Sequence, residues 1–132
     1  MENSVLKEFI LRSIAEDIGD GDHTSLACIP YGERGKAKLL VKDKGILAGI
    51  RVAQEIFKII DRDLKVDLIL EDGTNISPGD IAFYLSGSQQ SILKAERLVL
   101  NVMQRMSGIA TSTHEYARIL NGLKTKILDT RK

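Results

Sequence analysis

The sequence predicts an α/β fold of the α+β kind, an open-faced sandwich with helices on a small, mostly antiparallel sheet. Two observations predict it. Residues 1–86 read as short apolar strands separated by turn signals, with a helix at the start and one inserted helix. From residue 88 the pattern changes to long helical stripes that are followed by one short apolar strand. The second region therefore begins a further α/β unit.

Composition limits the classes of protein that the chain can belong to. Its 132 residues are enough for one domain with an apolar core, and 43% are hydrophobic and 28% charged. The net charge of +1 gives no basis for nucleic-acid binding. The single cysteine, Cys28, fits a reducing compartment, and no apolar run approaches the ~20 residues that span a bilayer. No secretory signal pattern opens the chain, so we expect a cytoplasmic protein without a membrane partner.

The first predicted element is a helix over residues 4–18, with Ser4 as its N-cap and Gly19 as its end. A loop, "GDGDHTS", follows it. Asp20, Asp22 and His23 invite a metal-site interpretation, but carboxylates two residues apart are a weak signal and favour a turn. The expected apolar face of the helix consists of Val5, Leu6, Phe9, Ile10, Ser13 and Ile14.

The sheet is predicted from alternating apolar residues between turn signals. Asp72-Gly73 and Pro78-Gly79-Asp80 mark two turns. The apolar spacing on one side of residues 51–60 predicts the inserted helix. The predicted strands cover residues 35–42, 45–49, 64–71 and 81–86.

The remainder of the chain predicts helix, helix, strand. Good helix formers with an apolar stripe run over residues 88–106, and Ser107-Gly108 is expected to interrupt them. A second helix over 109–121 should end near Gly122, and a strand is expected over 125–129. The apolar stripe of the first helix comprises Ile92, Ala95, Val99, Val102, Met103 and Met106.

Arg97 is the first candidate binding residue. Asn101 and Arg105 follow it at i+4 and i+8, so the three share a helical face away from the apolar stripe. That face is ordinarily solvated, with Arg97 paired to Glu96 or to a tertiary acid. The functional alternative is an anion clamp, because a guanidinium offers a planar fork to a carboxylate.

Other polar segments give weaker signals. Small residues over 107–113 favour tight helix packing or a subunit contact, with a phosphate site at the new helix N-terminus as the alternative. His23 and His114 lack ligand or triad partners at a recognisable spacing and are interpreted as surface residues.

The end of the chain, "KILDTRK", offers a second candidate site. If residues 125–129 form a parallel strand, Thr130, Arg131 and Lys132 lie at its carboxyl edge, where α/β folds place their active sites. A hydroxyl and two cations suit a substrate that is rich in carboxylate or phosphate oxygens.

Taken together, "ERLVLNVMQRMSGIATSTHEYARIL" and "KILDTRK" resemble the quinolinate phosphoribosyltransferase family, also called carboxylating nicotinate-nucleotide pyrophosphorylase. "EDIGDGDHTS", "KGILAGI" and "DGTNISPGDIAFYLSG" resemble its amino-terminal segments, so the resemblance covers residues 8–132. It implies a sandwich domain over residues 1–106 and the first helix and strand of an α/β barrel over 107–132.

The resemblance also implies an activity and a site. Quinolinate and 5-phosphoribosyl-1-diphosphate would be converted into nicotinate mononucleotide, carbon dioxide and diphosphate, with Mg2+ accompanying the diphosphate substrate, by a homodimer or larger assembly. Arg97 would bind a quinolinate carboxylate in the partner's site, and Thr130, Arg131 and Lys132 would bind substrate at the barrel mouth. No residue of the chain is assigned a catalytic role.

The family's later basic and acidic residues are missing from the chain, so we expect an amino-terminal portion of the enzyme that is inactive alone. Besides a purely structural interaction domain, two alternatives stay open. One is a paralogue of the same fold from molybdenum transport. The other is a biotinyl/lipoyl-like binding module, which would need Lys44 as its exposed acceptor.

Overall fold

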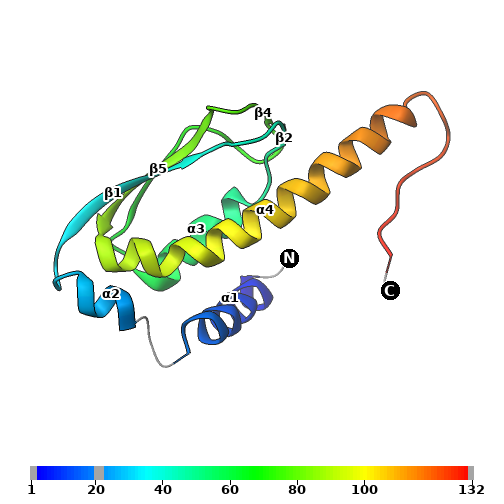
Figure 1. The fold of residues 1–132 in the computed structure, drawn as a ribbon. Helices are drawn as coiled ribbons and strands as arrows, with labels where there is room; N and C mark the ends of the chain where they lie inside the picture. Colours follow the sequence, from blue (N-terminus) through cyan, green and yellow to red (C-terminus); the bar gives the residue numbers. More distant parts are fainter. Residues whose placement is uncertain (1–2, 20–22, 131–132) are drawn as a thin grey trace.

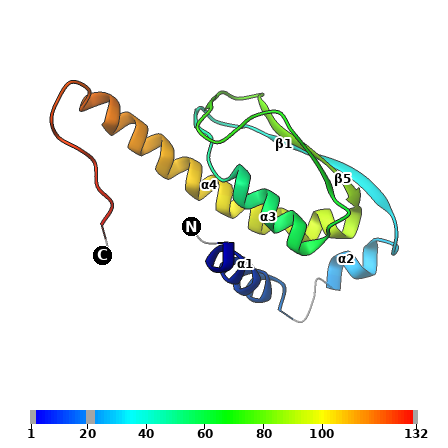
Figure 2. The ribbon, with the colours of Figure 1, turned by 180° about the vertical axis from the view of Figure 1, so that it is seen from behind.

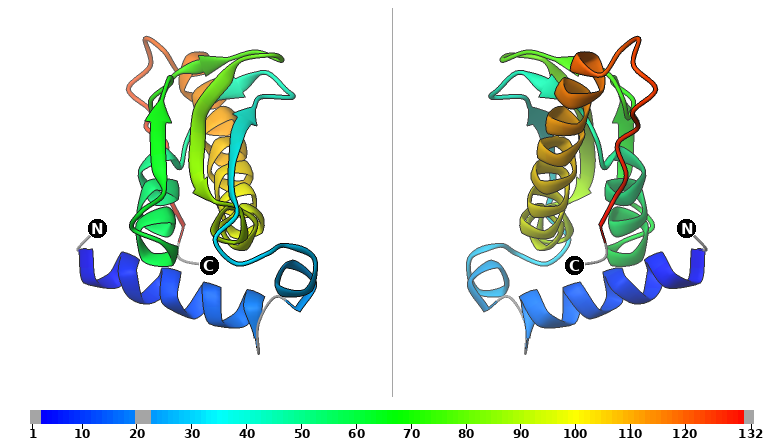
Figure 3. Two further views of the ribbon diagram at one scale, coloured as in Figure 1. Left: turned by 90° about the vertical axis from the view of Figure 1, so that its left-hand side faces the viewer. Right: turned by 90° about the vertical axis from the view of Figure 1, so that its right-hand side faces the viewer.

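The chain folds into three layers, a sheet, a pair of helices and a single helix (Figures 1 and 2). The computed structural model describes residues 3–19 and 23–130. Helices α3 and α4 cover one face of the sheet, and α1 crosses below them, which Figure 3 shows from both ends. The elements are α1 (Asn3–Ile18), α2 (His23–Cys28), β1 (Arg34–Leu40), β2 (Gly45–Ile46), α3 (Ile50–Ile60), β3 (Lys65–Leu68), β4 (Asn75–Ile76), β5 (Ile81–Ser88) and α4 (Gln89–Ile119).

The sheet is antiparallel, as the sequence predicts. Its three main strands have the order β1-β5-β3, and β2 and β4 form a separate two-stranded ladder. The open-faced sandwich is confirmed, because no described element covers the second face of the main sheet (Figure 1). Along β1 and β5, side chains alternate between the core and the open face, which is the pattern of a sheet with one buried side.

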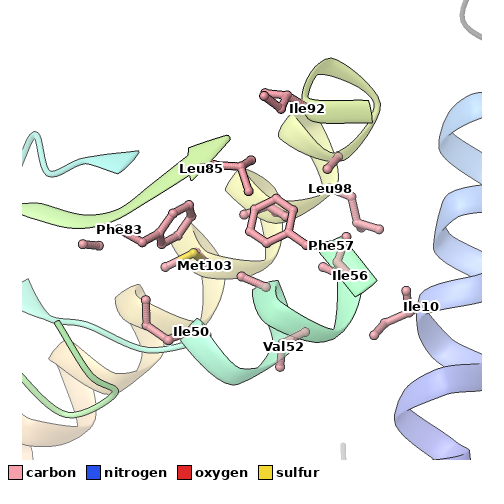
Figure 4. Close-up of a cluster of buried hydrophobic side chains, with 14 of the residues drawn as sticks. Ile10, Ile50, Val52, Ile56, Phe57, Phe83, Leu85, Ile92, Leu98 and Met103 are labelled. Carbon is pink, nitrogen blue, oxygen red and sulfur yellow. The ribbon is translucent and has the colours of Figure 1, made fainter. Parts of the chain in front are cut away.

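The core lies between the sheet and the α3–α4 layer (Figure 4). Phe57 of α3 and Phe83 of β5 meet edge to face, with ring centroids 5.6 Å apart. Ile10 is the residue of α1 that is completely buried against this core. Burial of such side chains supplies the main driving force for folding, at about 25 cal/mol for each Å² of apolar surface.

A glycine and an acid set the ends of two helices. Gly19 has φ +52° and ends α1 as predicted, with its N–H donating to the Ala15 carbonyl at 3.1 Å. Before α3, the Asp72 carboxylate accepts from the N–H groups of Ile50 at 2.8 Å and Arg51 at 3.3 Å. The predicted Asp72-Gly73 turn therefore also supplies a cap from a distant part of the chain.

Several predicted strands are shorter in the structure, for local reasons. β2 ends at Ile46 because the chain must turn at Gly49, where φ is +104°, to begin α3. β3 ends at Leu68 because the N–H groups of Ile69 and Leu70 both donate to the Ala82 carbonyl, which breaks the ladder. The short helix α2 was not predicted from the sequence.

The expected apolar face of α1 was too wide. Leu6 and Ile14 pack against the core beside Ile10, whereas Val5 and Phe9 are half exposed. Residues 6, 10 and 14 follow each other at i+4 and make a narrow stripe. Val5 and Phe9 lie one position earlier, so each points about 100° away around the helix.

The predicted helix break at Ser107-Gly108 is wrong, because α4 is one continuous helix through both residues. A single glycine costs a helix only about 1 kcal/mol, and here side-chain bonds from Thr111 to β2 and from Ser107 to Ala48, just after β2, hold the helix in place. Gly122, with φ +84°, turns the chain shortly after α4, as expected. The domain boundary placed at 106/107 stays a prediction.

The predicted strand over 125–129 is also wrong. Residues 125–130 have no regular structure, and no described strand is paired with them. A single parallel strand gains ladder hydrogen bonds only from neighbours in a sheet, so apolar sequence alone does not produce it.

Candidate functional site

Arg97 lies in a groove along the outer side of α4. The groove has a volume of about 400 Å³, and the residues around it recur at helical spacing on one face. The Arg97 side chain is 76% exposed, so its guanidinium is accessible to a ligand. The residues that line the groove are Leu93, Glu96, Arg97, Leu100, Asn101 and Gln104.

The acid that pairs with Arg97 comes from another helix. Arg97 Nε lies 3.2 Å from Asp17 Oδ1 at the end of α1, and the Asp17 side chain is 24% exposed. From the sequence, the partner could be Glu96 or an acidic residue brought close by the tertiary fold. The structure shows that it is the second kind. The contact runs through Nε. No second acid lies within ion-pair distance of Arg97 in the described parts of the chain.

The geometry leaves Arg97 suited to a further anion. An exposed ion pair contributes at most about 1 kcal/mol to stability. Asp17 therefore orients the Arg97 side chain, but a ligand that binds Arg97 would lose little free energy by weakening this ion pair. A carboxylate could therefore accept from the terminal nitrogens, which form the two-pronged edge of the guanidinium. Asn101 lines the same groove and adds an amide, whereas Arg105 is exposed but does not line it.

The structure does not bring the second candidate site to Arg97. Thr130 is exposed, its N–H donates to the Asp129 carboxylate at 2.8 Å, and it is not among the residues that line the groove. Arg131 and Lys132 lie outside the described residues. The substrate-binding roles expected of these three residues therefore stay predictions.

The small-residue segment of α4 is a packing surface, as the stronger of its two interpretations predicted. Thr111 Oγ1 accepts from the Ile46 N–H at 2.9 Å, and Ser107 Oγ accepts from the Ala48 N–H at 3.0 Å. A Cβ placed on Gly45 would lie 2.5 Å from Thr111 Oγ1, so β2 must approach the helix without a side chain there. The alternative of a phosphate site is wrong, because no helix begins at this segment.

No metal site is formed by the parts of the chain that the structure describes. Residues 3–19 and 23–130 contain no group of three His, Cys, Asp or Glu side chains that could hold an ion. Asp20 and Asp22 lie outside these ranges, and the side chain of His23 is not described. His114 is exposed, as expected. No helix in the described ranges is both long and apolar enough to cross a membrane.

Sequence reasoning found Arg97 by its residue type but missed most of its surroundings. Leu93 and Gln104 were not singled out, although their spacing of four and seven from Arg97 places them on its face, and Glu96 was considered only as an ion-pair partner. Asp17 carried no such signal, because an ion pair between residues eighty positions apart depends on how α1 crosses α4.

Comparison with known proteins gives consistent results. A family model described as "Quinolinate phosphoribosyl transferase, N-terminal domain" matches residues 22–107. The chain is 38% identical over its whole length to a probable carboxylating nicotinate-nucleotide pyrophosphorylase of Bacillus subtilis. It is 43% identical over 96% of its length to the mitochondrial quinolinate phosphoribosyltransferase 2b of Nicotiana tabacum. The chain spans 45% and 36% of these two relatives, which is less than half of each.

Solved structures agree with the sequence comparisons. NadC from Streptococcus pyogenes superimposes with a TM-score of 0.92 over 99% of this chain and 48% of its own, at 29% identity. The nicotinate-nucleotide pyrophosphorylase of Francisella tularensis gives a TM-score of 0.90 and 31% identity, over 99% of this chain and 47% of its own.

Proposed function

The chain belongs to the quinolinate phosphoribosyltransferase family, and from this membership we propose that it is the amino-terminal part of such an enzyme. The full enzyme would convert quinolinate and 5-phosphoribosyl-1-diphosphate into nicotinate mononucleotide, carbon dioxide and diphosphate. The family match and the relatives of B. subtilis and N. tabacum support this activity. By itself the chain would lack activity.

The observation that carries the proposal is the accessible guanidinium of Arg97 in a groove that also presents an amide. Quinolinate is a dianion at neutral pH, and its carboxylates are planar acceptors that match the guanidinium fork. Since the net charge of the chain is only +1, attraction of such a substrate must come from a few placed cations. We assign Arg97 to one carboxylate, and Thr130, Arg131 and Lys132 to further substrate oxygens.

The proposed reaction has two steps that such cations would assist. The pyridine nitrogen forms a bond to the ribose carbon as the bond from that carbon to diphosphate breaks. One carboxylate then leaves as carbon dioxide, and the ring carbon takes a proton from water. The electron pair left by the carboxylate is stabilised by the ring nitrogen, which became cationic in the first step. Arg97 would hold and orient a carboxylate during both steps.

A second copy of the chain is part of the proposal, because the Arg97 groove opens away from the molecule's own core. Apolar side chains also remain exposed along the second half of α4 and beyond it, and a partner would remove them from water. These residues are Ile109, Tyr116, Ile119, Leu123 and Leu128. We propose a homodimer or larger assembly in which Arg97 reaches the partner's site.

Mg2+ and the cellular compartment complete the proposal. The described residues do not fit a metal site of their own, so Mg2+ would enter with the diphosphate substrate, and we assign no step to it. We place the protein in the cytoplasm because its single cysteine fits a reducing compartment. The relatives' compartments differ, since those of tobacco and rice are named mitochondrial and chloroplastic.

A chimeric enzyme tests the proposed function. Residues 1–132 would replace the matching part of the B. subtilis relative, and formation of nicotinate mononucleotide from the two substrates would be measured. We expect an active chimera. Arg97→Ala should raise the KM for quinolinate by at least about tenfold and change that for the ribosyl donor much less, because a charge-assisted bidentate contact is lost.

Arg105→Ala is the matched control, because it removes a cation from the same helix but outside the groove. It should leave both KM values nearly unchanged. Equal effects of Arg97→Ala on both substrates would contradict the clamp role. A chimera that folds and assembles yet leaves quinolinate unconverted would contradict the proposed activity and favour the paralogue with another substrate.

A further inference from the structure

The open face of the main sheet carries polar side chains in two rows that the core and the Arg97 groove do not use. We propose that this face is a binding site for a mononucleotide, with the phosphate between Lys36 and Lys65 and the base on Tyr84. The proposal does not depend on the proposed enzymatic activity, because the residues that carry it lie on the opposite side of the sheet from α4.

The first row is formed by Lys36, Ser86 and Lys65. Ser86 of the central strand β5 pairs directly with Lys36 of β1 and with Lys65 of β3. Directly paired residues point to the same side of a sheet, and neighbouring strands lie ~4.8 Å apart. Two ammonium groups therefore flank one hydroxyl, which is a suitable arrangement for the oxygens of a phosphate.

The second row has Tyr84 at its centre. It lies two residues before Ser86 on β5, pairs with Lys38 and Asp67 on the neighbouring strands, and is 43% exposed. An accessible aromatic ring in the middle of a sheet offers a platform on which a nucleobase can stack. The Asp67 carboxylate beside it can accept a hydrogen bond from an exocyclic amino group of that base.

A hollow joins the two rows. A groove of about 430 Å³ is lined by Lys36, Lys65, Asp67, Tyr84 and Ser86, together with the intervening core-facing positions. The rows are two residues apart along β5, which corresponds to ~6.8 Å. A ligand that fits both rows has a phosphate at one end and a flat ring at the other, which describes a single nucleotide.

The charge of this face differs from that of the whole chain. Lys36, Lys38 and Lys65 against Asp67 give the two rows a charge of +2, which exceeds the net +1 of all 132 residues. Within the part of the chain that the structure describes, these four side chains form no ion pair with one another. Lysines on edge strands alone would discourage strand-to-strand aggregation, but that role does not require the central Tyr84.

Calorimetric titration of the 132-residue chain with AMP tests the proposal. We expect saturable binding with a dissociation constant below about 1 mM, weakening as salt is added. Adenosine and ribose 5-phosphate, which each carry half of the ligand, should bind at least about tenfold more weakly than AMP because each satisfies one row only. Amide chemical shifts in the NMR spectrum should change along β5 and β3.

Four variants localise the site. Lys36→Gln combined with Lys65→Gln should weaken AMP binding at least about tenfold. Tyr84→Val should weaken AMP but leave ribose 5-phosphate unaffected, whereas Tyr84→Phe, which keeps the ring, should bind AMP normally. Lys94→Gln removes one positive charge from the exposed side of α4 and should have no effect. Thermal unfolding of each variant checks that the sheet is intact.

Several results would overturn the proposal. The first is failure of AMP to saturate the protein below about 10 mM. The second is equal affinity for AMP and inorganic phosphate, which would remove the role of Tyr84. The third is chemical-shift changes that map to the Arg97 groove instead of the sheet. Binding of an adenine oligonucleotide without binding of AMP would also exclude a mononucleotide site.

Discussion

The two halves of α4 are parts of one helix with opposite surroundings. In the first half, Leu98, Val99 and Met103 are buried against α3 and the sheet. In the second half, Ile109 is 60% exposed and Ile119 is 70% exposed, and this half extends past the sheet (Figure 1). Both halves carry apolar residues at helical spacing, so the pattern in the sequence does not distinguish them.

The difference shows that an apolar stripe predicts a helix and its face but not what covers that face. The first half is stabilised by tertiary burial. The second half depends on helix propensity and on the junction that Thr111 makes with β2 and Ser107 with Ala48 just after it. The apolar side chains beyond that junction are exposed, so a second copy of the chain could contact them, as the proposed assembly requires.

The largest expected effect comes from comparing two methionines one turn apart. Met103 is 4% exposed and Met106 is 37% exposed. Met103→Ala should lower the free energy of unfolding by about 2–5 kcal/mol, because it leaves a cavity in the core. Met106→Ala should change it by less than about 1 kcal/mol. Urea unfolding monitored by circular dichroism would measure the free energy of unfolding of each variant. Equal losses of stability would contradict the difference in burial between the two halves of α4.

A glycine pair tests how closely the loop before α3 packs on the same helix. Gly49 and Gly79 have φ values of +104° and +97°, but only at Gly49 would a Cβ contact α4, 3.2 Å from Met103 Cγ. Gly79→Ala should cost about 1–2 kcal/mol from backbone strain. Gly49→Ala should cost about 1 kcal/mol more, because the backbone of α4 also blocks the new methyl group. Thermal melts of the two variants would reveal the difference.

The junction between the halves is tested at Thr111. Thr111→Val keeps the shape but leaves the Ile46 N–H without its acceptor, so we expect a loss of about 1–2 kcal/mol. Hydrogen exchange at the Ile46 amide should accelerate, because its bond to the helix is gone. Thr113→Val, on the exposed side of α4, is the control and should leave this exchange rate unchanged. An unchanged rate in Thr111→Val would argue against the junction.

The smallest effect concerns pH and the start of α4. The Ser91 hydroxyl donates to Asp61 Oδ2 at 2.7 Å and, with the Asp63 N–H, lowers the pKa of the Asp61 carboxyl, an effect that desolvation partly opposes. A lowered pKa in the folded state adds stability above the ordinary aspartate pKa and loses it as pH falls through the folded pKa. Ser91→Ala should raise the pKa of Asp61, which carboxyl NMR titration would measure. An unchanged pKa would contradict the assigned cause.

The candidate site was predictable only in part. The planar, permanently charged side chain of Arg97 marked it as an anion ligand from the sequence, and helical spacing placed Asn101 beside it. Its pairing with Asp17 was not predictable, because nothing local links the end of α1 to the middle of α4. The two rows on the open sheet face were likewise invisible, since they require the register of three strands that are not adjacent in sequence order.

The sequence by itself predicted α1, α3, the helical character of α4, the approximate places of β1, β2, β3 and β5, and the turns, because apolar periodicity and turn residues act over a few neighbouring positions. It also determined the family, through the length and order of its motifs. Only the tertiary structure decided that α4 continues through Ser107-Gly108 and that residues 125–130 form no strand. The physical reason is that a strand needs neighbouring strands to hydrogen-bond with. A helix that contains a glycine such as Gly108 is likewise stabilised by tertiary hydrogen bonds, and in both cases the partners come from distant parts of the chain.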